Sequence, residues 1–292
     1  MANREHLALL KAGAVQWIEW RQQNPQMKID ISTANLKGEN LRGADLQGVN
    51  LNKVDLSHAL LVRANLSSAD LSGANLHKAK LIEANLSQAN LSVANLSGAT
   101  LTQANLSYAN LIGADLSAAN LQGAIIAEAN LIGTDLRDAN LREADLGATK
   151  LIRANLGFAN LIEANLINAD LSEANLYEVQ LNGAYLYQAN FYKANLHQAH
   201  LSSAYLFRAN FTEANLSGAN LTWTNLTGAN LAGANLQGAN LRGAKLQGAN
   251  LKGANLQDTI MPEGATRFCE VGAIRWLEIK PSKGFEGLAA GL

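Results

Sequence analysis

A large apolar side chain recurs at every fifth position of this chain, from Ile31 to Met261. There are 47 such centres, of which 42 are leucine, and the period never slips by a residue. The residue two positions before the centre is small in nearly every repeat, and it is alanine in 38 of the 47. Extended backbone places residues i and i+2 on the same side, so we expect the small residue and the centre to point inward together, while the residues flanking the centre point out.

A five-residue period fits neither a straight strand nor a helix. In a straight strand, successive centres would face opposite sides because the side-chain period is two. In an α-helix, a step of five residues advances about 140° beyond a full turn, which would spread the leucines around the cylinder. The chain must therefore turn once per repeat, so that stacked coils of short strands keep every centre on one axis. Glycines after the centre, such as Gly38, Gly73 and Gly218, suit the corners of these coils.

The repeat unit reads Ala-(Asn/Asp)-Leu followed by two variable residues, as in residues 64–68 and 234–238. It closely resembles the pentapeptide repeat family, especially its cyanobacterial members. The resemblance implies an all-β solenoid, a right-handed quadrilateral β-helix with four pentads per coil. Unusual outward residues that recur after twenty positions, such as Tyr185 and Tyr205, favour four pentads over three, although Ile152 and Ile167 would suit fifteen. Nearly twelve coils at the ~4.8 Å sheet spacing predict a rod of roughly 55 Å.

Three segments follow from the limits of the repeat: residues 1–28, 29–263 and 264–292. The first is predicted to cap the solenoid with one amphipathic α-helix over about residues 4–23, because Leu7, Leu10, Ala14 and Trp17 follow helical spacing. Its charged residues form no cationic face, which disfavours membrane binding. The last segment carries a further apolar set: Phe268, Val271, Ile274, Trp276, Leu277 and Ile279. It would cap the last coil or form a homodimer through that end, and the sequence leaves both open.

The composition excludes several classes of partner and location. The formal net charge is −1 and charged residues make up 16% of the chain, so no direct nucleic-acid binding is expected. No apolar run approaches the roughly 18 residues of a membrane span, and the first residues lack the apolar region of a secretory signal. The single cysteine, Cys269, excludes an internal disulfide. We therefore expect a cytoplasmic protein without membrane insertion.

The repeat leaves little room for catalysis, because leucine and alanine fill its interior and polar groups stand on flat faces. The sequence contains no phosphate-binding loop, dinucleotide fingerprint or nucleophile elbow. His197 and His200 have a spacing seen in metal sites, but they should flank a corner and no third ligand is evident nearby. The prediction is a protein that is not an enzyme, with no catalytic residue, no cofactor and no metal.

The position before each centre is asparagine in 28 repeats and aspartate in 8. Stacked asparagines can hydrogen-bond to one another and to adjacent backbone, which gives this position a structural role. The resemblance suggests an alternative, since some family members mimic DNA and inhibit a type II topoisomerase, gyrase. That mimicry requires a strongly acidic surface. The excess of asparagine and the net charge of −1 count against it.

Residues that depart from the pattern are the candidates for function, since exposed apolar clusters mark interaction surfaces. On a twenty-residue coil, Ile167, Tyr187 and Phe207 share one column, with Tyr185 and Tyr205 beside it. Tyr177, Tyr192 and Trp223 are expected on adjoining faces or corners. A second column holds Ile112, Ile132 and Ile152.

These candidates have three interpretations. Cross-strand stacking that stabilises the sheet is the structural one. Tyrosine and tryptophan anchors for a partner protein are the second, and a carbohydrate-binding surface is the third. The predicted function is a non-enzymatic, rod-shaped scaffold for interaction with an unidentified protein, and a regulatory role is what the resemblance implies.

Overall fold

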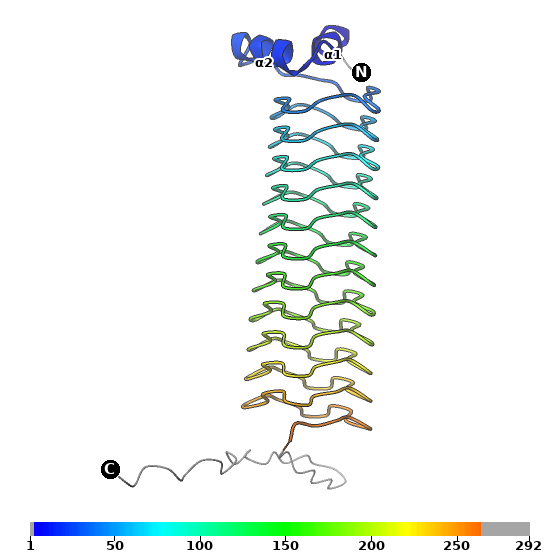
Figure 1. Ribbon diagram of the computed structural model, residues 1–292, viewed down its shortest axis with the longest axis vertical. Helices are drawn as coiled ribbons and strands as arrows, with labels where there is room; N and C mark the ends of the chain where they lie inside the picture. The colour runs from blue at the N-terminus through cyan, green and yellow to red at the C-terminus, as the bar shows by residue number, and fades with distance from the viewer. Residues whose placement is uncertain (1–2, 264–292) are drawn as a thin grey trace, which may run out of the picture.

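The computed structural model describes residues 3–263, and within them the side chain of Ala14 is left undescribed. Two short helices lie at one end of a straight rod of stacked coils (Figure 1). The segment 264–292, predicted to cap the rod or to form a homodimer, lies outside the described residues.

Parallel β-bridges set the register of the coils. Each bridge joins a residue to the one twenty positions later, from Asp30↔Asn50 to Asn240↔Ile260. Four pentads therefore make one coil, as predicted, and a fifteen-residue coil is excluded. We number the faces of this quadrilateral β-helix by their centres, each recurring every twenty residues: face 1 runs from Ile31 to Leu251, face 2 from Leu36 to Leu256, face 3 from Leu41 to Met261 and face 4 from Leu46 to Leu246.

Every corner is a hydrogen-bonded turn. The centre accepts a hydrogen bond from the N–H three residues later, for example at 3.0 Å between the Ala64 nitrogen and the Leu61 oxygen. The second residue after the centre has a positive φ, between 50° and 71°, in each repeat from Thr33 to Asp258. Glycine favours this left-handed conformation, yet thirty of these corner residues are not glycine. Hydrogen bonds between coils therefore hold many non-glycine residues in a backbone conformation that their side chains disfavour.

The interior is a buried column of centres and small residues. Leu66 and Ala64 are both 0% exposed, and the rings of Phe191 and Phe211 stack inside the column with centroids 4.7 Å apart. Threonine replaces alanine at a few inward positions, where its hydroxyl donates to a backbone carbonyl. The Thr134 hydroxyl, for instance, lies 2.8 Å from the Leu111 oxygen. These exceptions therefore bury no unsatisfied hydroxyl.

The prediction of one helix over residues 4–23 is wrong, because the segment forms two. Helix α1 is Arg4–Lys11 and helix α2 is Ala14–Gln23. Gly13 between them has a φ of 118°, a value that helical backbone does not allow. The break lets α1 and α2 each lay a buried side chain on the first coil, Leu10 and Trp17 respectively.

Candidate interaction surface

Asparagine and aspartate side chains before the centres form ladders along the rod. The Asn85 Oδ1 accepts a hydrogen bond from the Ser87 N–H at 3.1 Å, while the Asn75 Nδ2 donates to the Asp55 Oδ1 one coil away at 3.0 Å. Many ladder residues thus accept from an N–H of their own turn and hydrogen-bond to the ladder residue of a neighbouring coil, as the stacked-asparagine interpretation predicts. A residue of another type at this position removes both contacts.

Face 4 has four ladder positions without asparagine or aspartate, and at two successive ones the residues are Tyr185 and Tyr205; the other two are Ile125 and Lys245. In the coil before them, the Ile167 N–H donates to the Asn165 Oδ1 at 3.1 Å. In the coil after them, the Thr227 N–H donates to the Asn225 Oδ1 at 3.2 Å. Among the described residues, the N–H groups of Tyr187 and Phe207 have no such acceptor. The tyrosines therefore cost the turn two hydrogen bonds.

The aromatic side chains of face 4 form two parallel stacks. The rings of Tyr185 and Tyr205 lie 5.1 Å apart with planes within 4°, and those of Tyr187 and Phe207 lie 5.7 Å apart with planes within 5°. Tyr185 and Tyr205 are 47% and 51% exposed, and Tyr187 and Ile167 are each 36% exposed. We call these five residues, with Phe207 among them, the aromatic patch. In each stack, one face of each ring lies against the other ring, and the ring edges remain at the surface.

Within the described part of the chain, the tyrosine hydroxyls of the aromatic patch have no hydrogen-bond partner. Among the described residues, none hydrogen-bonds to the hydroxyls of Tyr185, Tyr187 or Tyr205. Other surface tyrosines differ: the Tyr108 hydroxyl donates to Glu128 at 2.8 Å, a bond that raises the pKa of Tyr108. The patch therefore offers three hydrogen-bonding groups beside its ring edges.

The structure separates the remaining candidates from the patch. Tyr177 lies on face 2, two pentads or half a coil from face 4, so its expected place on an adjoining face is wrong. Tyr192 lies on face 1, half-buried, with the Lys193 ammonium 5.0 Å from its ring centroid. Trp223 stands at the corner between faces 3 and 4, 68% exposed. Its indole covers Gly243 so closely that a Cβ there would lie 2.4 Å from the ring.

A second aromatic cluster on face 2 was missed by the sequence reasoning. The Phe158 ring packs edge-on against Tyr177 at 5.2 Å, and Tyr177 stacks on His197 at 5.7 Å. Phe158 is 51% exposed. Phe158 and Tyr177 are nineteen residues apart, so only a search that allowed a corner residue to contact the next column would find them.

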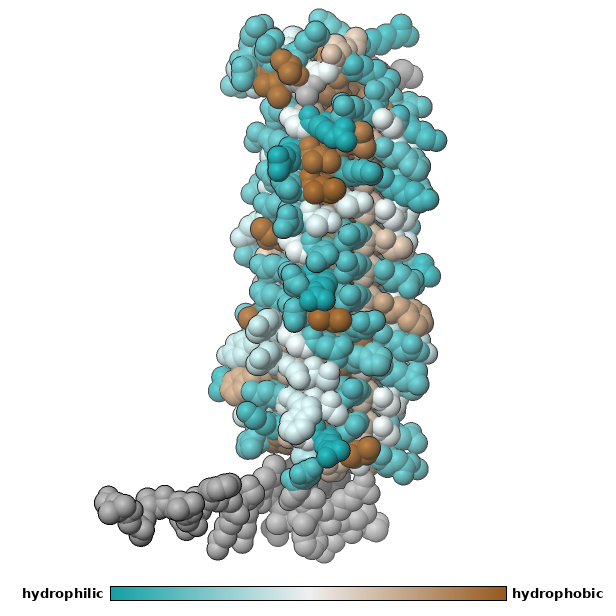
Figure 2. Space-filling view, in the orientation of Figure 1, coloured by the Kyte–Doolittle hydropathy of each residue, from teal (hydrophilic) through white to brown (hydrophobic). Residues whose placement is uncertain are grey.

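The isoleucine column of face 1 is less exposed than the aromatic patch. Ile112 is 40% exposed, whereas Ile132 and Ile152 are half-buried. The side of the rod seen in Figure 2 is mainly hydrophilic, with hydrophobic groups in small separate spots. This column is adequately explained by packing between neighbouring coils.

The two candidate metal ligands, His197 and His200, lie on faces 2 and 3. The His197 Nδ1 lies 2.7 Å from the Ser217 hydroxyl, and its ring is covered by Tyr177. Within the described part of the chain, no group of three or more ligand side chains is placed to hold a metal ion.

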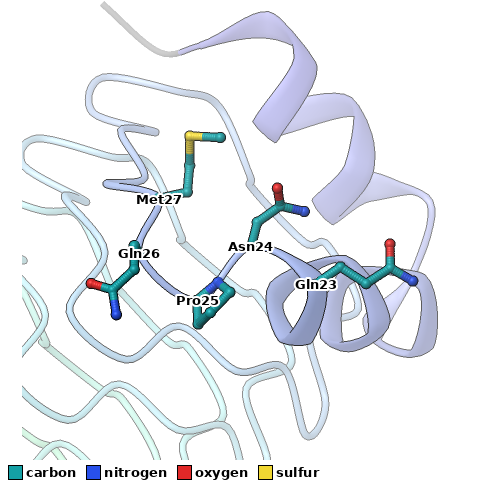
Figure 3. Close-up of a pocket in the computed structure, with 5 residues that line it drawn as sticks. All are labelled: Gln23, Asn24, Pro25, Gln26 and Met27. Atoms are coloured by element: carbon teal, nitrogen blue, oxygen red, sulfur yellow. The ribbon is translucent and has the colours of Figure 1, made fainter.

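A hollow of about 400 Å³ lies where α2 joins the rod (Figure 3). Its lining, residues 23–27, contains no ionisable side chain.

A sequence profile described as "Pentapeptide repeats" matches eight copies in overlapping segments, from residue 29 to residue 261. The chain belongs to the pentapeptide repeat family. Among curated proteins no significant match was found.

Three solved structures illustrate the range of this pentapeptide repeat family. HetL, involved in heterocyst differentiation regulation in the cyanobacterium Nostoc sp. strain PCC 7120, is 34% identical; the match covers 85% of this chain and 98% of HetL, with a TM-score of 0.35. QnrB1, a plasmid-mediated fluoroquinolone resistance protein, is 17% identical over 78% of this chain and 90% of its own, with a TM-score of 0.32. A pentapeptide repeat protein of the Arabidopsis thaliana thylakoid lumen is 24% identical. The match covers 49% of this chain and 68% of that protein, with a TM-score of 0.16.

Neither helix of this pentapeptide repeat protein is long and apolar enough to cross a membrane, over the residues that the structure describes.

Proposed function

We propose that this chain is a non-enzymatic scaffold that binds a partner protein through the aromatic patch of face 4. The observation that carries the proposal is the replacement of two consecutive ladder residues by Tyr185 and Tyr205. The replacement leaves two turn N–H groups without their usual acceptor and adds exposed ring edges and free hydroxyls.

Stability alone gives a poor account of this replacement. An aromatic pair contributes about 0.5–1.5 kcal/mol beyond its buried area. Each lost hydrogen bond costs about 0.5–1.5 kcal/mol, and two turn bonds are lost along with the contacts to neighbouring ladder residues. The loss therefore equals or exceeds the gain. Tyrosine is, by contrast, enriched among the residues that contribute most to protein–protein binding, because it combines a large apolar ring with a hydrogen-bonding group.

Membership of the pentapeptide repeat family supports a role in interaction rather than catalysis. A regulatory process is consistent with HetL, which is described as involved in regulating differentiation. The rigid rod supports the same proposal: hydrogen bonds between all coils hold the patch in shape, so little ordering would oppose binding.

The double variant Tyr185→Asn/Tyr205→Asn tests the proposal because it restores the ladder residue. We expect capture of the partner from a lysate of the source organism to be lost, with the free energy of unfolding unchanged or raised by about 1 kcal/mol. Unchanged capture with the same bait density would refute the patch as the binding surface. A large loss of stability would instead support the interpretation that the rings serve packing alone.

The matched control is Phe158→Gly/Tyr177→Ser, which removes the cluster on the opposite face. It deletes a similar area of exposed aromatic surface and places glycine at a corner where φ is 61°. We expect it to retain capture. Equal losses in both double variants would show that exposed aromatic surface binds without regard to face, which contradicts the proposal.

The two alternatives have less support. Only 8 of the 47 ladder positions are aspartate and the net charge is −1, so a DNA-like acidic face is not favoured. Carbohydrate rings bind best to open aromatic faces, and one face of each ring in the two stacks is covered by the other ring. We place the scaffold in the cytoplasm as part of this proposal, on the single cysteine.

A further inference from the structure

The two ends of the described rod present different hydrogen-bonding groups. At the first coil, backbone carbonyls point away from the rod, and the amino-terminal segment satisfies three of them. Asn3 donates its N–H to the Asp30 oxygen at 2.9 Å. The Trp17 Nε1 donates to the Asp45 oxygen at 2.6 Å, and the Arg21 guanidinium donates to the Gln47 oxygen at 3.0 Å.

The last coil presents mainly donors. In each coil, the N–H groups of the centre and of the second residue after it donate to the coil that follows, as Leu241 does to the Ile260 oxygen at 2.7 Å. In the last coil, such groups lack an acceptor among the described residues at Leu246, Gly248, Leu251, Gly253 and Leu256. The end of the rod is therefore a row of backbone donors with fewer acceptors among them. Each pentad offers two such N–H groups and one carbonyl, that of the residue two before the centre, which in earlier coils accepts from the next coil, as the Ala229 oxygen does from the Asn250 N–H.

The row of donors surrounds an apolar surface formed by the centres and small residues of the last coil. The centres Leu256 and Met261 are half-buried, whereas the equivalent centres one coil earlier, Leu236 and Leu241, are 0% exposed. Ala249 and Ala254 are each 8% exposed, against 1% and 0% for Ala229 and Ala234. Exposed strand edges with apolar interiors invite pairing with other chains unless they are covered.

The chain itself supplies a segment of suitable length and composition. Twenty-nine residues, 264–292, follow the last coil, and the described chain ends directly beneath it (Figure 1). The first half of the segment carries the apolar set Phe268, Val271, Ile274, Trp276, Leu277 and Ile279. Trp17 and Leu10 cover the first coil with the same kinds of side chain.

We propose that residues 265–280 bind over the last coil of their own chain, with backbone carbonyls accepting from this row of donors and apolar side chains covering Leu256 and Met261. Tethering gives this segment an effective concentration in the millimolar range, which a separate molecule does not reach. A second copy could meet the edge only with its own last coil, because α1 and α2 occupy its first. Two donors for each acceptor would then meet the same excess of donors, so half of the N–H groups would stay unpaired. This inference is independent of the aromatic patch.

The test is amide hydrogen exchange in the full chain, followed by mass spectrometry of peptides spanning residues 244–261. We expect these amides to be protected in the native chain and to exchange at least about tenfold faster in Phe268→Glu/Trp276→Glu. Peptides from residues 101–201 serve as an internal measure of folding and should not change. Lys283→Gln, outside the apolar set, is the control and should retain protection.

Two results would overturn the proposal. Rapid exchange at residues 244–261 in the native chain would show that nothing covers the edge. Protection that falls on dilution, together with a doubled mass in light scattering, would show that a second copy covers it instead of the chain's own segment.

Discussion

At the corners, single residues hold a conformation that their side chains disfavour. Thirty non-glycine residues have φ between 50° and 61°. For an L-residue this region costs roughly 1–2 kcal/mol, so the hydrogen bonds between coils must offset it at each corner. Glycine at the corner was predicted from its frequency, but a lysine or tryptophan in the same conformation was not. Sequence shows the turn, whereas the strain at non-glycine corners arises only once neighbouring coils fix the backbone.

Gly43→Ala tests the strain at a corner directly. Gly43 has a φ of 65° and no atom lies within 4 Å of the position that an added Cβ would take, so the substitution changes backbone strain without a clash. We expect the free energy of unfolding in urea to fall by about 1 kcal/mol. Gly157→Ala is the control, because Gly157 has no positive φ and its added carbon would make ordinary contacts at 3.5 Å and beyond. Equal losses in the two variants would argue against corner strain.

Aspartates in the ladders should make stability depend on pH. The Ser32 hydroxyl and N–H lower the pKa of Asp30. Desolvation raises the pKa of Asp55, but hydrogen bonds from the Ser57 N–H and hydroxyl outweigh it, so the pKa of Asp55 is also lowered. A lowered folded pKa adds stability above the unfolded value of about 3.9, and that stability is lost as the pH falls through the folded pKa.

The variant Asp30→Asn/Asp55→Asn should therefore lose less stability than the native chain between pH 7 and acid conditions. Asparagine still accepts the Ser32 and Ser57 N–H bonds, now at 2.8 and 3.0 Å, but it does not titrate. Urea unfolding at neutral pH and below the unfolded pKa measures the difference. Glu19→Gln/Glu173→Gln removes two charges away from the ladders, and an equal effect there would assign the pH dependence to net charge.

Among the elements, the position and helical structure of the amino-terminal cap were predicted, but its division into two helices was not. The apolar spacing of Leu10 and Trp17 indicated a helix that faces the solenoid, and both side chains are buried. The spacing did not reveal the break, because Gly13 is tolerated inside many helices and only contact with the first coil decides between one helix and two. Hydrogen bonds from Trp17 and Arg21 to that coil depend on a tertiary arrangement that spacing alone does not encode.

Trp17→Ala should destabilise the first coils and leave the far end of the rod unchanged. Trp17 is 0% exposed, and the substitution removes both its packing and its bond to the Asp45 oxygen. The expected cost is about 3–5 kcal/mol. Coils of a solenoid contact only their neighbours, so hydrogen exchange should accelerate over residues 30–50 and not over 201–241. Val15→Ala, at a residue that is 71% exposed, is the control. A uniform loss along the rod would contradict the nearest-neighbour picture.

For the molecule as a whole, the twenty-residue coil decides which distant residues meet. Columns such as Tyr187 with Phe207 follow from that number alone, and they were predicted. The same number places Tyr177 half a coil from the aromatic patch. Tyr177 is close to Tyr185 in sequence, and that closeness had suggested a place beside the patch. Contacts that cross a corner, such as Phe158 with Tyr177, depend on side-chain direction as well and could not be read from the spacing.

Deleting one whole coil should shorten the rod by about 4.8 Å and keep every face aligned. Removal of residues 87–106 joins Leu86 to Ser107 and spares the aromatic patch, whereas removal of residues 187–206 joins Leu186 to Phe207 and takes Tyr187 and Tyr205 away. Both deletions remove twenty residues and four pentads, so we expect similar thermal stability and circular dichroism. Only the second should abolish partner capture, because it dismantles both ring stacks while the rest of face 4 remains. If both deletion variants bound the partner equally, the partner would have to recognise the regular repeat. If neither variant bound it, binding would have to require the full length of the rod.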